Sequence, residues 1–166
     1  MTFSGAAPAA PRQLSTRRFA VFGATCLLAA VLLEDALAFG PARPDFVVVL
    51  LVYGSIRWGA LGGAALGFGL GLIRDALVLY SLGYHGLGMT LLGYAVGKLR
   101  ETLYLSAPAV DLLLLVGAKL ALDILVLAGA AGGAWAAFEV RFFWEAPVGA
   151  LYTAGLGGLL YRIFRG

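Results

Sequence analysis

The chain alternates long apolar blocks with short polar stretches, and its charged residues gather near the ends of the blocks. A helix needs about 20 apolar residues to cross roughly 30 Å of hydrocarbon, so blocks of this length indicate membrane-spanning helices. The blocks lack the roughly ten-residue alternation that is typical of outer-membrane strands. We therefore predict an all-α integral membrane protein with six transmembrane helices, at about residues 19–39, 45–57, 58–80, 84–99, 107–134 and 146–164.

The first two blocks and the segment before them need separate interpretation. Residues 1–16 have no apolar periodicity and begin with an Ala- and Pro-rich stretch, which predicts a mobile cytoplasmic tail ahead of a single domain at 17–166. Ala36-Leu37-Ala38 resembles a signal-peptide cleavage site, but the apolar stretch before it is already at the upper limit of a signal core. The second block is short, which predicts a thin or tilted span, or one shielded by neighbours.

Composition supports a location in the bilayer. Hydrophobic residues make up 61% of the 166 residues and charged residues 13%, with a mean hydropathy of +0.93, which leaves too little polar surface for a water-soluble globule. The net charge of +3 comes from scattered basic residues, which favours topology signals over a nucleic-acid surface. Cys26 is the single cysteine, which excludes an intramolecular disulfide.

The distribution of Lys and Arg predicts the orientation of the spans, because cytoplasmic loops carry an excess of these residues. With the N terminus inside, eight basic residues lie inside and two outside. The inside set is Arg12, Arg17, Arg18, Arg57, Lys98, Arg100, Arg162 and Arg165, and the outside set is Arg43 and Arg141. Both termini are thus predicted to be cytoplasmic. The aromatic residues between Trp135 and Glu145 predict an interfacial helix at the outer face.

Glycines four residues apart form a ridge in the third block, at Gly59, Gly63, Gly67 and Gly71. In a membrane helix such a ridge lets another backbone approach closely, so these residues predict helix packing or docking of a partner helix. Gly86, Gly93 and Gly97 form a second small-residue stripe. Because the first ridge drifts by about 160° around its helix, we expect it to meet two neighbours, or one neighbour at a right-handed crossing. We favour different neighbours for Gly59 and Gly63 than for Gly71 and Asp75.

Among the charged residues of the predicted spans, four are candidates for an intramembrane charge network: Arg74, Asp75, Lys119 and Asp123. Such residues are costly in hydrocarbon and require partners. Lys119 and Asp123 are four apart and can pair on one helix face, while Arg74 can extend to the outer surface and Asp75 can pair locally. Alternatively, Arg74 pairs with Asp123 at matching depth, and Asp75 and Lys119 complete a neutral quartet.

Sequence motifs give little support to an enzyme. His85 is the single histidine and lies in a predicted turn, where we expect a surface residue. We find no cluster of residues at metal-ligand spacing, no Gly-x-Ser-x-Gly and no phosphate-binding loop. We therefore predict no catalytic residue, no metal and no cofactor.

One part of the chain, residues 44–97, resembles a known family. The resemblance depends on an ordered series: Pro44-Asp45, an aliphatic run to Tyr53, Arg57, Gly59, Gly67-Phe68, Gly71-Leu72, Asp75, Leu82-Gly83, Gly93-Tyr94 and Gly97. This series is similar to that of the bacterial rod shape-determining protein MreD, and the length and six-span layout also match. The family pattern assigns no role to Arg74, Lys119 or Asp123.

The resemblance implies a multi-pass, non-enzymatic component of the bacterial cytoplasmic membrane. Its implied role is to act as a scaffold in the Rod complex, which controls cell shape and lateral peptidoglycan synthesis. The implied partners are the single-span coiled-coil protein MreC and, through it, a membrane glycosyltransferase and transpeptidase pair and the MreB filament. The implied fold is similar to the substrate-binding subunit of energy-coupling-factor transporters.

Two functions stay open at this point. In the first, the chain is a scaffold whose glycine ridge, or its surroundings, docks a partner's transmembrane helix. In the second, it is a small-molecule or lipid-binding membrane subunit of a transporter, with polar groups of residues 58–80 and 107–134 lining a pocket open to the outer face. The sequence favours the scaffold, because it offers few convergent polar side chains. A membrane enzyme acting on lipid-linked substrates through Arg74, Asp75 and His85 lacks further acid or base groups.

Overall fold

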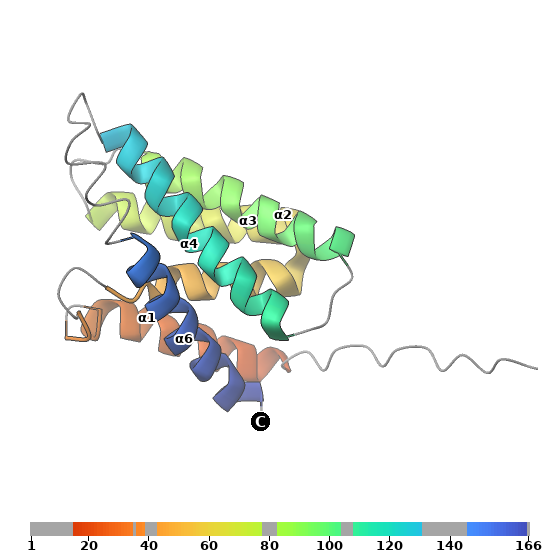
Figure 1. Ribbon diagram of the computed structural model, residues 1–166. Coiled ribbons are helices and arrows are strands. Elements are labelled where there is room, and N and C mark those ends of the chain that lie inside the picture. Colours follow the sequence, from red (N-terminus) through yellow and green to blue (C-terminus); the bar gives the residue numbers. More distant parts are fainter. Residues whose placement is uncertain are drawn as a thin grey trace, which may run out of the picture.

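The computed structural model describes residues 15–34, 36–38, 43–77, 83–103, 108–130 and 146–165. Within them the regular structure is helical, which confirms the all-α prediction. The helices are α1 (Thr16–Leu32), α2 (Phe46–Leu77), α3 (Tyr84–Leu103), α4 (Pro108–Ala130) and α6 (Ala146–Arg165) (Figure 1). Residues 1–14 of the predicted tail and the predicted interfacial helix at 135–145 lie outside the described residues. Among the described helices, α2 alone is long and apolar enough to cross a membrane by length and composition.

The α2 helix reverses direction at Gly59. This residue has φ 72° and ψ −168°, a conformation that is open to glycine and strained for other residues. Asp45 precedes α2 and Arg74 lies near its end, so a straight helix would separate them by about 44 Å. Their side chains are 2.7 Å apart. Residues 46–58 and 60–77 therefore run antiparallel, and we call them the first and second arms of α2 (Figure 1).

Glu101 of α3 stabilises this reversal. Its Oε1 accepts a hydrogen bond from the backbone N–H of Ala60 at 3.1 Å. The carboxylate thereby lies at the N terminus of the second arm, where unpaired N–H groups and the helix dipole favour a negative charge. A Cβ atom at Gly59 would lie 2.6 Å from the same oxygen, so contact and backbone conformation both favour glycine there.

The second arm of α2 packs against α3 at backbone distance. A Cβ atom added at Gly67 would lie 2.1 Å from the carbonyl oxygen of Met89, closer than real Cβ contacts. The same geometry recurs along both helices, where Gly59 meets Gly97, Gly63 meets Gly93, Gly67 meets Met89 and Gly71 meets Gly86. Small residues give membrane helices this close van der Waals contact.

The preference for two different neighbours along the ridge was wrong. All four glycines of the ridge contact α3, so this helix is a neighbour of the ridge for its whole length, and Gly63 also approaches Ser55 of the first arm. The physical reason lies on α3, whose own glycines at Gly86, Gly93 and Gly97 let its backbone follow the ridge as it drifts. The ridge is thus occupied by internal packing and is covered by α3.

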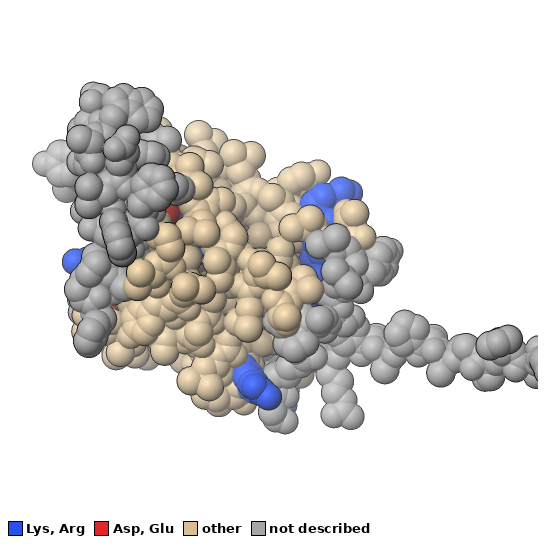
Figure 2. Space-filling view, in the orientation of Figure 1, with Lys and Arg blue, Asp and Glu red and all other residues tan. Residues whose placement is uncertain are grey.

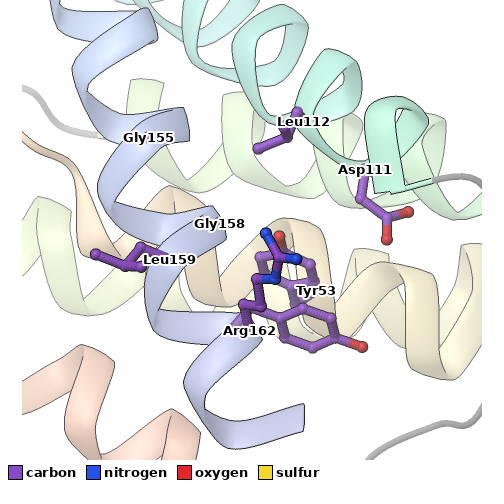
Figure 3. Close-up of a pocket in the computed structure, with 8 residues that line it drawn as sticks. Tyr53, Asp111, Leu112, Gly155, Gly158, Leu159 and Arg162 are labelled. Atoms are coloured by element: carbon purple, nitrogen blue, oxygen red, sulfur yellow. The ribbon is translucent and has the colours of Figure 1, made fainter. Parts of the chain in front are cut away.

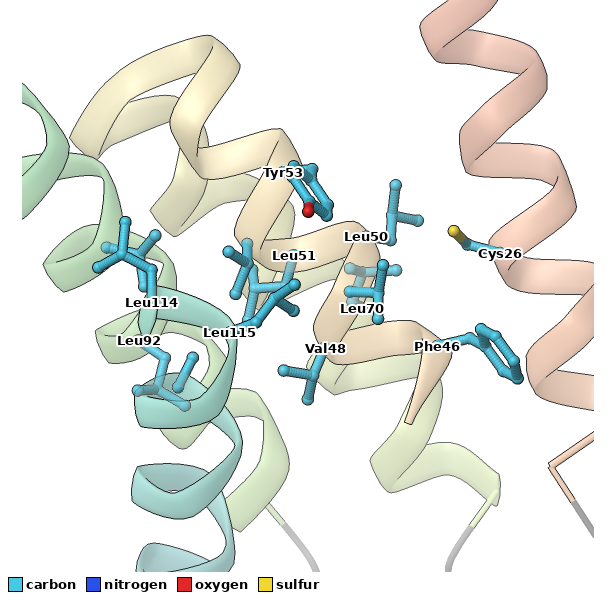
Figure 4. Close-up of a cluster of buried hydrophobic side chains, with 14 of the residues drawn as sticks. Cys26, Phe46, Val48, Leu50, Leu51, Tyr53, Leu70, Leu92, Leu114 and Leu115 are labelled. Carbon is cyan, nitrogen blue, oxygen red and sulfur yellow. The ribbon is translucent and has the colours of Figure 1, made fainter. Parts of the chain in front are cut away.

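The apolar core surrounds the first arm of α2. Figure 4 shows Leu51 of this arm beside Leu115 of α4, and Leu50 on the side of Cys26 in α1. Five consecutive residues of the arm, from 48 to 52, are at most 5% exposed. Burial on every side explains why this short block lacks an amphipathic pattern. Of the alternatives given for this short block, the structure has the one in which neighbours shield it.

We expect Gly67→Ala to destabilise the protein by about 2–3 kcal/mol, because its Cβ atom would force the backbones of α2 and α3 apart. Thermal unfolding in a mild detergent measures this change. Gly69→Ala is the matched control, since nothing lies within 4 Å of a Cβ atom at Gly69. That variant should be neutral or more stable by up to about 1 kcal/mol, from helix propensity alone. Equal losses of stability in the two variants would contradict the packing argument.

Candidate functional site

Asp45 is the centre of a buried polar network where several helix ends meet. The residue is 4% exposed and precedes the first residue of α2. Its Oδ1 accepts a hydrogen bond from the backbone N–H of Val48 at 3.1 Å, as an N-cap aspartate does. Its own backbone N–H donates to Oγ1 of Thr153 in α6 at 3.1 Å. Asp45 thereby joins the start of α2 to α6.

Two cations from different helices face the carboxylate of Asp45. Nη1 of Arg74, from the second arm of α2, lies 2.7 Å from Oδ2, and Nζ of Lys119, from α4, lies 3.8 Å from the same oxygen. Lys119 also donates a hydrogen bond to Asp123 one turn further along α4. Arg74 is a quarter exposed and Asp45 is buried, so these charges interact with little screening by water.

Glu34 completes the network from the turn beyond the end of α1. Its Oε1 accepts a hydrogen bond from the backbone N–H of Phe46 at 3.2 Å. Burial, reinforced by the negative charge of Asp45, raises the pKa of Glu34 to about 7. Three carboxylates face two cations here, and protonation of Glu34 brings the formal charge of the network to zero.

A second polar contact lies between the end of α2 and the start of α3. Oδ2 of Asp75 accepts a hydrogen bond from the N–H of Gly86 at 2.8 Å, and Oδ1 accepts one from the N–H of His85 at 3.2 Å. The His85 ring nitrogen Nδ1 lies 3.1 Å from Oδ1. Asp75 therefore satisfies N–H groups that the first turn of α3 would leave unpaired.

The structure changes the predicted quartet in two places. Arg74 forms its ion pair with Asp45, while Asp123, which also acts on Arg74 electrostatically, hydrogen-bonds to Lys119. Asp75 belongs to the separate contact with His85. His85, which we expected at the surface, is partly buried beside Asp75, with its side chain 13% exposed. The local pair of Lys119 and Asp123 is present as one of the alternatives had it.

Sequence reasoning missed Asp45, Glu34 and Thr153 as members of the network. A signal for Asp45 was available, because an aspartate directly before an apolar block is typical of an N-cap. The predicted layout also put residues 45 and 74 at the same membrane face. Thr153 carried no comparable signal, since it fits a stripe of small residues with Gly149 and Gly157.

The network around Asp45 connects α2, α4 and α6 and holds these helices together. Asp45, Arg74 and Lys119 are engaged with one another, and the described residues hold no group of three or more His, Cys, Asp or Glu side chains placed to bind a metal ion. Removing one member of a buried ion pair leaves an uncompensated charge, which costs much more than the pair itself contributes.

We expect Asp45→Asn and Arg74→Gln each to destabilise the protein by about 3–5 kcal/mol. The double variant should be no less stable than the weaker single variant, because it removes both charges of the pair. Thermal unfolding of the four proteins in detergent gives the coupling energy, and simple additivity would contradict the pairing. Lys98→Ala is the control, because its partner Glu101 lies 3.9 Å away on an exposed surface and this variant should lose less than about 1 kcal/mol.

The raised pKa of Glu34 predicts a dependence of stability on pH. The folded state holds the proton more tightly than the unfolded state, so stability falls as pH rises from about 4.5 through about 7. Glu34→Gln should remove this loss, with a higher unfolding temperature than the parent at pH 8 and a similar one at pH 4.5. An unchanged difference between the two proteins across this range would contradict the assignment.

Comparison with known proteins places the chain in a family. Residues 18–165, which reach from α1 to α6, match the family model described as rod shape-determining protein MreD. Searches of curated proteins and of solved structures found no match. The match extends well beyond the residues 44–97 on which the resemblance in the sequence depends, and it includes the whole network around Asp45. The chain belongs to the family of the rod shape-determining protein MreD, bacterial inner-membrane proteins that function in rod shape determination.

Proposed function

We propose that this protein is a non-enzymatic membrane scaffold of the Rod complex, the machinery of cell-wall elongation. In this role it binds a single-span coiled-coil protein of the MreC type, and through it the MreB filament and a glycosyltransferase and transpeptidase pair. The observation that carries the proposal is the family match over residues 18–165. The family is one of shape-determining structural proteins and no known enzyme family.

The geometry of the polar residues supports a scaffold. A solute site needs convergent polar groups that are available to a ligand, whereas Asp45, Arg74, Lys119 and Asp123 bind one another. The backbone contact between α2 and α3 adds a rigid body on which a partner helix can be positioned. Apolar side chains remain exposed on the outside of this body, among them Leu61 of α2 at 81% and Val31 of α1 at 77%.

The arrangement of the helices supports a multi-pass protein with both termini in the cytoplasm. Nη2 of Arg57, at the reversal of α2, donates a hydrogen bond to Oγ1 of Thr16 at the start of α1, over 3.2 Å. Nη1 of Arg100, near the end of α3, lies 3.2 Å from Oδ1 of Asp111 at the start of α4. Together with the contact of Glu101 to Ala60 and the cavity that Asp111 and Arg162 share, these contacts bring basic residues predicted to be cytoplasmic to one end of the described structure. We call this the basic end; it holds Arg17, Arg57, Lys98, Arg100 and Arg162. Figure 2 shows a broad band without charged side chains, with Lys and Arg at its margins. Such a band suits the hydrocarbon layer.

Purification of the tagged chain from its membrane in mild detergent tests the proposal. We expect a single-span coiled-coil membrane protein to co-purify, and we expect Gly69→Ala to retain it. A co-purifying ATPase module or a bound vitamin would favour the transporter subunit and contradict the scaffold.

Depletion of the protein in a rod-shaped host provides a test in cells. We expect cells to lose their rod shape and become round as lateral wall synthesis loses its organisation. Complementation with Gly69→Ala should restore rods, while Asp45→Asn should fail to do so at the same expression level. Unchanged cell shape after depletion would count against a role in elongation.

A further inference from the structure

A cavity of about 540 Å³ opens between α4 and α6, near the basic end and away from the network around Asp45. Its volume is within the range of about 300–1,000 Å³ for small-molecule sites. The walls are mainly apolar, and Tyr53 of α2 reaches the cavity and stacks on Tyr161 of α6 at a ring distance of 3.9 Å. Figure 3 shows Leu112 and Asp111 on α4, and Gly155, Leu159 and Arg162 on α6.

The charges around the cavity favour an anion. Asp111 is neutralised by Arg100, whose Nη1 lies 3.2 Å from its Oδ1. Arg162 lines the cavity, is exposed, and has no carboxylate within 4 Å among the described residues. The cavity therefore combines an apolar groove with a surplus positive charge at the end of α6.

The contact between α4 and α6 beside the cavity favours a single hydrocarbon chain over a helix as its occupant. A Cβ atom at Gly158 would lie 2.7 Å from Cδ2 of Leu112, so α4 and α6 are already in contact there. A helix with its side chains is about 10 Å across and cannot lie between them. One turn away, a Cβ atom at Gly155 would meet nothing within 4 Å, which leaves space above the contact.

We propose that this groove binds one anionic phospholipid from the cytoplasmic leaflet, with its phosphate at Arg162 and an acyl chain along α6 over Gly155. The proposal rests on the membrane orientation proposed above and adds a ligand site to the scaffold. Basic pockets between transmembrane helices on the cytoplasmic side are known to bind anionic headgroups. The mainly apolar walls suit the acyl chain, because the chain leaves the bilayer for surroundings of similar polarity.

Native mass spectrometry of the purified chain with added lipid tests this site. We expect phosphatidylglycerol adducts to form at about fivefold lower concentration than phosphatidylcholine adducts. Arg162→Gln should abolish that preference, since one basic residue contributes about this factor, while Arg162→Lys should keep it. Gly155→Leu should weaken binding of both lipids, because its Cβ atom would meet nothing within 4 Å and the rest of the side chain would occupy the groove.

Two matched variants separate this site from general attraction to the membrane. Arg17→Gln removes an exposed cation at the same end of the molecule, and Gly69→Leu adds the same side chain to an open position on α2. Both should bind lipid as the parent does, and thermal unfolding in the same detergent checks that every variant is folded. Equal losses in Arg17→Gln and Arg162→Gln would overturn the proposal.

Occupation of the groove by a protein partner would also overturn it. That outcome is recognised if Gly155→Leu prevents co-purification of the coiled-coil protein and leaves the phosphatidylglycerol adducts unchanged. Because the adducts are measured on the isolated chain, a failure of the lipid proposal is distinguishable from a failure of the scaffold.

Discussion

The ion pair between Asp45 and Arg74 is the interaction on which the arrangement of the helices depends. It joins the two ends of α2, whose arms must run antiparallel for the 2.7 Å contact to exist. The carboxylate of Asp45 also faces Lys119 of α4, and the backbone N–H of Asp45 donates a hydrogen bond to Thr153 of α6. In hydrocarbon, a charge without a partner costs several kcal/mol, so each helix that supplies a partner is held in one register. The pair thus selects one arrangement among the many that apolar surfaces alone would allow.

The glycine contacts between α2 and α3 answer the second requirement of a membrane protein. Lipid is as apolar as leucine, so burying leucine side chains between helices adds little, and close van der Waals contact has to hold the helices together. The approach of Gly67 to the Met89 backbone supplies that contact. Asp75 then fixes the start of α3 by accepting hydrogen bonds from its first N–H groups. The α2–α3 pair is therefore held both by backbone packing along its length and by the hydrogen bonds of Asp75 at the start of α3.

The sequence allows the helices, the reversal near Gly59 and the importance of the glycines to be predicted, because all three depend on local pattern. The partners of the charged residues depend on which helix faces meet, and this is where prediction failed. Counting depth along a helix put Arg74 level with Asp123, but depth does not specify the direction of a side chain around the helix axis. Arg74 instead forms its ion pair with Asp45 at the start of the first arm, where Nη1 and Oδ2 are 2.7 Å apart. The contact of the whole ridge with α3 was not the alternative we favoured for a related reason, since the drift was calculated for a straight partner without glycines of its own.

The two ends of the molecule differ in a way that bears on its role. At the end around Asp45, the described charged side chains satisfy one another, and the helices are fixed by contacts that leave little for a ligand. At the basic end, α4 and α6 leave a groove beside Arg162, and an ion pair between Arg100 and Asp111 joins α3 to α4. A scaffold of the kind proposed above requires a fixed frame, which the ion pairs around Asp45 can supply. In the proposed scaffold the closed end is the rigid frame, and the groove between α4 and α6 is where we propose that a lipid of the surrounding leaflet binds.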